Sequence, residues 1–485
     1  MKRKINLLLK TLAVFSLLAA FSCDLQTDLE VENLENPNDE ILTSDPVALQ
    51  SKAATIFKNW YMSTTSTVAP GFAFNTMADV SSCSWGNFGM RDLSSEPRVA
   101  FNNTVSYGND VTNSYFNSLY SVLFDSNTLV AAYEAGTEFD NPALIASIGK
   151  FGQALAIGYN ALVFDQVWVS DETGPIGEGS SDYKTAMDFA LTKLDEAIAI
   201  AEGNSFNVPT EWMPGNSFSS AQFAKLMRSF GARFMVMSPR NSTEKAAIDW
   251  NRVKNYAENG VTADFNILHD DVNWYDLFKT YLVYPGWART DLYVISLMDS
   301  SYPDYWPDGA TILPEANSSD ARLASDFQYL DSQSFRPERG TYHYSSYRYS
   351  RWDEYISEWT IPTVELALAE NEMYLAEAYL NLNRAGDAAA VINAGTRVTR
   401  GQLAPVSSTP ADVADAIHYE RIVELGVSSM GLSFFEMRGL DLLQSGTLLH
   451  FPVPGKALEA IPAENYTFGG SSGEAGTDYS TGGWR

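Results

Sequence analysis

An all-α fold is predicted by three observations on the sequence. Apolar and small residues recur at helical spacing over residues 45–62, 111–260 and 361–443. Gly and Pro interrupt the pattern between successive helices, and an approximate repeat of helix pairs recurs within it. Residues 64–110 and 262–360 lose the period and are rich in aromatic and small polar residues. We therefore expect a helical scaffold that carries two long, irregular, aromatic-rich loop regions.

The first residues have the pattern of an export signal. Positions 2–4 are basic, and the run Leu12–Phe21 is apolar except for one serine. This run is too short to span a bilayer, which favours a cleaved signal. Because Cys23 follows directly, residues 1–22 are predicted to be a lipoprotein signal peptide and Cys23 the lipidated residue. An ordinary secretory signal that contains a cysteine is the alternative.

The mature chain is predicted to be strongly acidic. Removal of residues 1–22 takes away four basic residues, so the formal charge moves from -28 to -28 - 4 = -32. Such a charge repels nucleic acid and anionic headgroups, so membrane contact is expected only through the lipid. With Cys23 acylated, Cys83 has no partner for an intramolecular disulfide. Residues 23–44 are expected to be an acidic tether and residues 45–485 a single domain.

The central helical block is divided by breakers at Gly174-Pro175, Pro209, Pro214 and Pro239. Pro362 is expected to open the last helical block. The helices predicted between these points span about 112–136, 142–168, 182–202, 219–238 and 244–259.

A repeat of helix pairs is clearest over residues 365–396. Small residues such as Ala376 and Ala388 are spaced as in tetratricopeptide pairs, where they let two antiparallel helices approach closely. The segment 183–202 and the helix beginning at Trp250 are expected to be the second helices of two further pairs. These apolar stripes are assigned to the core of the scaffold.

Several motifs follow one another in a characteristic order along the chain. They are the Cys23 signal, Asp182–Ile198, Glu372–Asn393, Ile417–Leu425, Phe434–Arg438 and Phe451–Pro454. Their order resembles the SusD/RagB family of Bacteroidetes outer-membrane lipoproteins. The likeness implies four tetratricopeptide-like pairs that support an irregular aromatic surface. It also implies a lid over a SusC-like TonB-dependent barrel, which captures oligosaccharides, or peptides in some branches, before import.

No catalytic motif is found in the sequence. Nucleotide-binding glycine loops and the G-x-S-x-G motif are absent, and the four histidines have no metal-site spacing. Adjacent carboxylates are expected by chance in a chain with 60 acidic residues. Glu420 and Glu424 share a helix face, and ion pairs with Arg421 or Arg438 are the favoured interpretation.

A cofactor is not predicted. Asp304, Asp308 and Asp320 could ligate calcium through oxygen atoms, although their spacing matches no defined calcium loop.

Aromatic residues in the loop regions are the candidate ligand contacts. Sugar rings have apolar faces that stack on aromatic rings, and their hydroxyls need carboxylates, amides or arginine nearby. Three loop stretches combine both kinds of residue. The tyrosine-rich stretch Tyr342–Trp352 is the alternative location or a surface facing a partner. The predicted ligand-binding residues are Trp85, Phe88, Trp287, Tyr302, Tyr305 and Trp306.

The function predicted is non-catalytic glycan binding at the cell surface by a lipid-anchored outer-membrane protein that delivers its ligand to a SusC-like barrel. Peptide capture in a RagB-like uptake system is the first alternative. A helical-barrel glycosidase or lyase and a pure protein-interaction module are the others.

Overall fold

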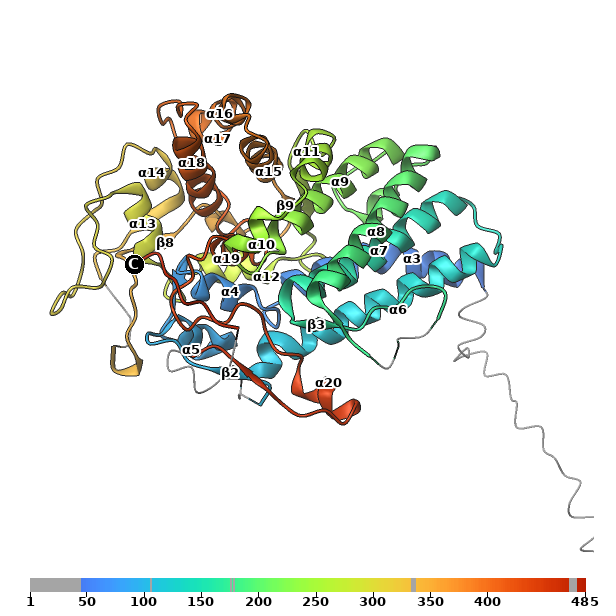
Figure 1. Cartoon of the computed structure of the whole chain (residues 1–485), viewed down its shortest axis with the longest axis horizontal. Helices are drawn as coiled ribbons and strands as arrows, with labels where there is room; N and C mark the ends of the chain where they lie inside the picture. Colours follow the sequence, from blue (N-terminus) through green and yellow to red (C-terminus); the bar gives the residue numbers. More distant parts are fainter. Residues whose placement is uncertain (1–44, 105–106, 175–176, 178, 333–336, 471–477) are drawn as a thin grey trace, which may run out of the picture. The chain divides into compact units, whose positions relative to one another are not determined.

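The computed structural model describes residues 45–485 with a few internal gaps (Figure 1). The signal peptide, Cys23 and the tether 23–44 lie outside the described residues. Gln50–Arg485 form one compact unit, called the second unit. The gaps are residues 105–106, 175–176, 178, 333–336 and 471–477.

Most of the second unit is helical, as predicted. Consecutive helices α6, α7, α8 and α9 pack one against the next, and they are seen side by side in Figure 1. α11 packs on α9 and on α15, which continues the series toward the C-terminal helices. The helices of this first part are α3 (Pro46–Thr65), α6 (Ser114–Glu134), α7 (Pro142–Val163), α8 (Tyr183–Gly203), α9 (Ser220–Met237), α10 (Ser242–Ala246) and α11 (Trp250–Glu258).

Side chains at the helix starts explain these boundaries. Asn141 accepts a hydrogen bond from the Leu144 amide ahead of α7. Ser219 and Gln222 form a reciprocal capping box at the start of α9. The expected helix 244–259 is divided into α10 and α11 because the Asp249 side chain caps a new helix.

Small residues allow α7 to lie close to its neighbours. A Cβ atom on Gly152 would lie 2.2 Å from the Ser126 hydroxyl oxygen, and one on Gly158 would lie 2.5 Å from the Phe234 ring. Such distances are shorter than van der Waals contact, so only glycine fits at these crossings. This is the role that the repeat pattern assigns to small residues.

The C-terminal helices complete the scaffold. α15 packs on α16 and on α18, and Ala376, Ala388 and Ile392 are fully buried between them. The predicted helix pair is therefore confirmed. These helices are α15 (Leu368–Asn381), α16 (Ala385–Ala394), α17 (Thr396–Thr399), α18 (Pro410–Val423), α19 (Leu432–Gly439) and α20 (Gly455–Ala460).

The two loop regions contain short elements. The short helices are α4 (Gly71–Met77), α5 (Met90–Ser94), α12 (Leu277–Val283), α13 (Leu292–Met298) and α14 (Arg322–Asp326). Single helical turns occur there at η1 (Asn87–Gly89), η2 (Asn109–Asn113), η4 (Pro337–Arg339) and η5 (Asp353–Ile356), whereas η3 (Thr210–Trp212) lies between α8 and α9.

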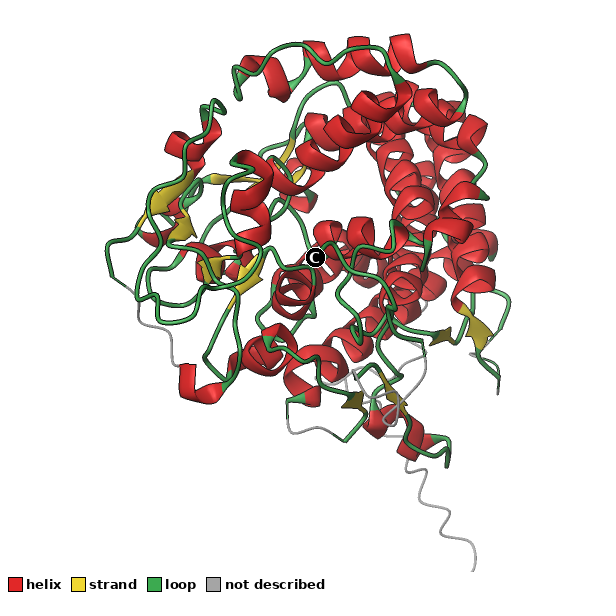
Figure 2. Cartoon of the chain, turned by 60° about the vertical axis from the view of Figure 1, so that its left-hand side comes forward, coloured by secondary structure: helices red, strands yellow, loops and turns green. Residues whose placement is uncertain are grey.

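Strands occur only as small antiparallel pairs in the described residues (Figure 2). One pair, residues 81–82 with 289–290, joins the two loop regions, and another, residues 101–102 with 467–468, joins the first loop region to the C-terminal segment. The pairs are β1 (Ser81–Ser82) with β6 (Arg289–Thr290), β2 (Phe101–Asn102) with β10 (Thr467–Phe468), β3 (Gln166–Val167) with β4 (Ser181–Asp182), β5 (Phe265–Leu268) with β9 (Pro362–Leu366), and β7 (Phe327–Tyr329) with β8 (Tyr347–Tyr349).

The predicted start of the last helical block is wrong. Residues 362–366 form β9, and α15 begins only at Leu368. This segment pairs with β5, where Phe265 lies opposite Leu366. A pairing partner about a hundred residues away decides the conformation, so the local helical pattern could not reveal it.

A buried ion pair links the two halves of the scaffold. Arg233 on α9 binds both carboxylate oxygens of Glu370 on α15, at 2.7 and 2.9 Å, and both side chains are almost fully buried.

None of the helices in the described part of the chain is long and apolar enough to cross a membrane.

Candidate functional site

The β1–β6 pair brings the first loop region beside the second. Ser82 lies opposite Arg289, so the chain leaving β1 runs next to the chain entering β6. The Trp85 indole N–H donates to the carbonyl of Gly286 at 3.2 Å, although these residues are 201 positions apart. Trp85 and Trp287 are therefore neighbours.

Aromatic rings gather at this junction. Trp287 lies 4.5 Å from Tyr281, 5.8 Å from Phe88 and 6.0 Å from the buried ring of Phe72, measured between ring centroids. Trp287, Phe88 and Tyr281 are half-buried. Trp85 is 39% exposed and Tyr284 is 50% exposed. We call Trp85, Phe88, Tyr281, Tyr284 and Trp287 the aromatic surface.

The aromatic surface rests on a fixed backbone. The Cys83 thiol donates to the Trp287 carbonyl at 3.1 Å, and the Trp85 amide donates to the Cys83 sulfur at 3.4 Å. Burial raises the pKa of Cys83 to about 11, although a backbone hydrogen bond and Arg91 oppose it. This thiol is therefore protonated at neutral pH, and its role is structural.

Charged side chains border the aromatic surface. The Arg339 guanidinium lies 5.3 Å from the Trp85 ring centroid and donates to the Ser84 carbonyl at 3.1 Å. Arg91 bonds the Asp92 carboxylate at 2.8 Å beside Gly86. Rings with exposed faces thus lie next to donors and acceptors, which is the combination that a saccharide requires.

The remaining predicted residues separate into a surface group and a core residue. Tyr305 is 54% exposed and meets the His343 ring edge-on at 5.0 Å. Trp306 is half-buried and stacks on Tyr344 at 4.4 Å with an interplanar angle of 27°. We call Tyr305, Trp306, His343 and Tyr344 the second aromatic group.

Tyr302 is not at the surface, contrary to expectation. Only 6% of it is exposed, and its hydroxyl donates to the Pro314 carbonyl at 3.4 Å. The ring packs near Tyr347 in the interior of the loop region, where no ligand could stack on it. Tyr342 and Tyr347 of the alternative stretch are buried as well.

One short segment connects the two aromatic groups. Arg339 lies over Trp85 at one end of this segment, and Tyr344 stacks on Trp306 at the other. Bridges from Glu96 to Thr341 and from Asp291 to Tyr344 hold it in place. The two groups therefore border the same segment.

Glu96 fastens this segment electrostatically. Its carboxylate accepts a hydrogen bond from the His343 Nε2 at 3.2 Å and pairs with Arg485. Burial opposes ionisation of Glu96, but the His343 hydrogen bond and the charges of Arg485 and Arg98 outweigh it and lower the pKa to about 2.

The sequence did not single out Tyr281, Tyr284 or Arg339. The two tyrosines lie within one of the predicted aromatic stretches, so its composition was the available signal. Arg339 carries no local signal, because only the tertiary structure places it over Trp85.

The carboxylates considered for chemistry have structural partners. Glu420 and Glu424 bond Arg322, whereas Arg421 pairs with Glu377 and Glu436. Ion pairing at this helix face is thus observed, and Arg421 ties α18 to α15 and α19, but Glu420 and Glu424 pair with Arg322 and not with Arg421 or Arg438.

The calcium ligands considered from the sequence do not form a site. The Asp320 carboxylate bonds Arg322 at 2.8 Å and accepts the Tyr419 hydroxyl at 2.7 Å. Over residues 45–485 outside the gaps, no three side chains of metal-binding type gather.

The comparison by sequence returns no match, either to a protein-family model or to a curated protein. Solved structures are similar throughout most of the chain. A SusD superfamily protein from Bacteroides vulgatus ATCC 8482 is 13% identical with a TM-score of 0.58, and the alignment covers 87% of this chain and 98% of that one.

Two further structures concern carbohydrate. A SusD-like carbohydrate binding protein from the same organism is 13% identical with a TM-score of 0.53, over 78% of this chain and 81% of that one. A structure determined with xylogluco-oligosaccharide is also 13% identical with a TM-score of 0.53, over 86% and 85%. The chain therefore has the SusD-like fold that its sequence motifs predicted.

Proposed function

We propose that this chain is a non-catalytic, cell-surface glycan-binding lipoprotein whose ligand stacks on the aromatic surface. The observation that carries the proposal is the junction of Trp85 with Trp287, where exposed rings adjoin Arg339, Arg91 and Asp92. The carbohydrate bound in one structure of the same fold supports it.

Binding is tested by affinity electrophoresis of the purified chain in gels that contain neutral or acidic polysaccharides, with xyloglucan included. Trp85→Ala and Trp287→Ala are expected to weaken binding several-fold to about tenfold, because a stacked ring contributes about 0.5–1.5 kcal/mol beyond its buried area. Trp306→Ala tests whether the second aromatic group contributes. Phe124→Ala is the matched control, since Phe124 is a 65% exposed ring on α6 outside both groups.

Unchanged mobility of all three tryptophan variants would place the ligand elsewhere. A fall of many degrees in their melting temperature would instead identify these rings as structural. No binding of any polysaccharide, with binding of peptide mixtures in a pull-down, would favour peptide capture as in RagB-like systems.

The absence of catalysis is a separate part of the proposal. Its support is that candidate carboxylates such as Asp270 and Asp353 have local structural roles. Asp270 accepts three backbone amides of its own turn, from residues 272–274, and Asp353 pairs with Arg348. Release of new sugar ends at enzyme-like rates, about 1 to 1000 per second, would contradict it.

The anchor and the partner are proposed from the sequence. Cys23 is expected to hold the chain at the outer membrane, and a SusC-like TonB-dependent barrel is expected to receive the ligand. Cys23→Ser should release the protein from the membrane fraction. Mild detergent extraction followed by pull-down should recover a barrel, and recovery of this chain alone would argue against the partnership.

A further inference from the structure

A cavity of about 480 Å³ lies between helices α15, α16 and α17 and the segment that leads into β9. It shares no lining residue with the aromatic surface or with the second aromatic group. Its volume is in the range of small-molecule sites, about 300–1000 Å³. Trp352 and Tyr355 line one wall of the cavity.

This wall is an ordered aromatic pair. The Trp352 and Tyr355 rings are parallel within 7°, with centroids 5.5 Å apart. The Arg351 guanidinium lies 4.6 Å from the Trp352 ring, and the Tyr355 hydroxyl donates to the Pro362 carbonyl at 3.2 Å. These contacts fix the rings before any ligand arrives, which lowers the entropic cost of binding.

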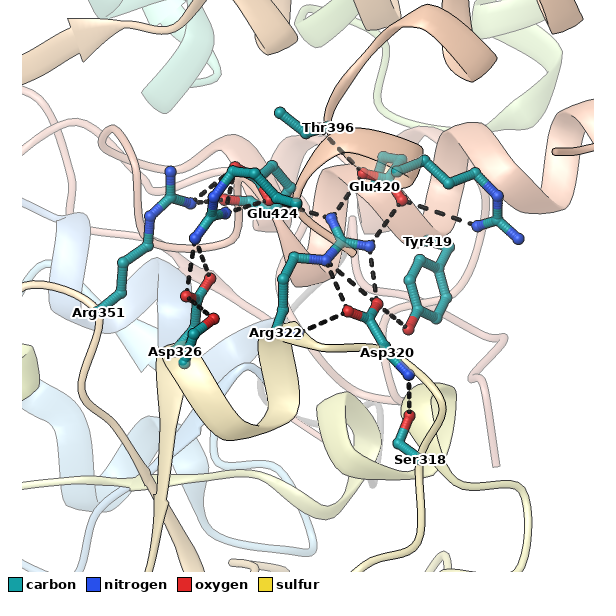
Figure 3. A network of polar contacts seen from close by, with 12 residues as sticks. Ser318, Asp320, Arg322, Asp326, Arg351, Thr396, Tyr419, Glu420 and Glu424 are labelled. Carbon is teal, nitrogen blue, oxygen red and sulfur yellow. Dashed lines mark hydrogen bonds and ion pairs between the residues drawn. The ribbon is translucent and has the colours of Figure 1, made fainter. Parts of the chain in front are cut away.

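The arginines of the cavity are already neutralised. Arg400 bonds the Glu424 carboxylate at 2.6 Å and the Asp326 carboxylate at 2.8 Å, and Arg351 bonds Glu424 at 2.9 Å. Figure 3 shows the network to which they belong. Its charges balance, with Arg322, Arg351, Arg397 and Arg400 against Asp320, Asp326, Glu420 and Glu424.

Glu372 is a carboxyl group of the cavity that lies outside this network. Burial, together with the nearby charge of Asp264, raises the pKa of Glu372 on α15, and no hydrogen bond counteracts the shift. The Glu372 Oε2 lies 3.0 Å from the position that a Cβ atom on Gly395 would occupy. Glycine at this position therefore leaves room beside the carboxyl group.

These features define the ligand chemistry. An anion would meet Glu372, Glu354 and Asp264 without a free cation, because both arginines are neutralised. A hydroxylated ring could place its apolar face on the half-buried Trp352 and its hydroxyls on Glu372 and Glu354. We propose that this cavity is a second site of the chain, which binds the end of a neutral saccharide.

This inference rests on the proposed glycan function but concerns a different site. The test uses the full-length chain in detergent and saturation-transfer NMR with glucose, galactose, xylose and mannose, each alone, and with a lysine dipeptide. Ala394→Trp places a large ring at an exposed residue that lines the cavity. Glu372→Leu removes the carboxyl group, whereas Glu372→Gln keeps a donor and an acceptor.

At least one sugar is expected to bind the parent and the Trp85→Ala, Trp287→Ala double variant alike. Ala394→Trp should abolish this signal, and Glu372→Leu should weaken it about tenfold or more, as for lost hydrogen bonds to a buried carboxyl group. Glu372→Gln should bind within a few-fold of the parent. Circular dichroism and melting temperature show whether each variant is folded, and the exposed position 394 keeps the test valid if Glu372→Leu does not fold.

Three outcomes would overturn the second site. The first is that no sugar gives a saturation-transfer signal with the parent chain. The second is that the sugar signal persists in Ala394→Trp. The third is that only the lysine dipeptide binds in the cavity. If polysaccharide binding at the aromatic surface persists in any of these cases, the proposed function stands and only the second site fails. If the parent chain itself binds no polysaccharide, the proposed function is refuted instead.

Discussion

Replacing Glu96 by glutamine tests the electrostatic attachment of the segment between the two aromatic groups. The Glu96 side chain is 20% exposed and faces His343 and Arg485. Despite burial, these partners lower its pKa from 4.5 to about 2. Because the folded pKa is depressed, ionised Glu96 stabilises the fold fully above about pH 4.5, and this stabilisation is lost as the pH falls through about 2.

The magnitude follows from the two pKa values. A difference of 4.5 - 2 = 2.5 corresponds to about 3 kcal/mol of unfolding free energy at neutral pH, at about 1.36 kcal/mol per pKa unit. Glu96→Gln keeps the shape of the side chain but cannot ionise. It is therefore expected to lose up to about 3 kcal/mol at neutral pH, and progressively less as the pH falls from about 4.5 toward 2, where about half of the parent carboxylate is protonated in the folded state.

Urea unfolding followed by tryptophan fluorescence, at about pH 7 and at intervals down to about pH 3, measures both effects. Glu211→Gln is the control, since Glu211 is an exposed carboxylate on η3. Equal unfolding midpoints for the two variants at neutral pH would refute the attachment. A stability loss in Glu96→Gln that does not shrink toward low pH would refute its electrostatic origin.

Three further predictions concern the buried network, the aromatic surface and the helix crossings. Arg322→Met should lower the unfolding free energy by about 3–5 kcal/mol in urea unfolding, because the carboxylates that it bonds stay buried without their partner; a loss below about 1 kcal/mol would contradict this. Trp85→Ala should change the melting temperature little while weakening glycan binding, because the ring is 39% exposed. Gly158→Ala should destabilise the fold measurably, since its Cβ would lie 2.5 Å from the Phe234 ring, and an unchanged melting temperature would show that the ring can move.

The long helices could be predicted from the sequence because their determinants are local. The apolar period and the polar residues at helix starts act within a few positions, so α7 begins at the predicted residue 142 and α8 within one residue of 182. The ends are less certain: α7 stops at Val163, where the prediction continued to 168. The approach of Trp85 to Trp287 depends on the pairing of the distant strands β1 and β6, which no local pattern encodes.

Tertiary structure decided the features that depend on distant partners. Residues 362–366 form a strand because they pair with β5. Glu420 pairs with Arg322, which is 98 positions away, and not with the adjacent Arg421. Tyr302 and Tyr305 lie three positions apart in one aromatic stretch, yet only Tyr305 is exposed. Composition indicated that the stretch was a candidate site. The burial of each ring, however, depends on which face of the stretch packs against the rest of the chain, and no local pattern encodes this packing.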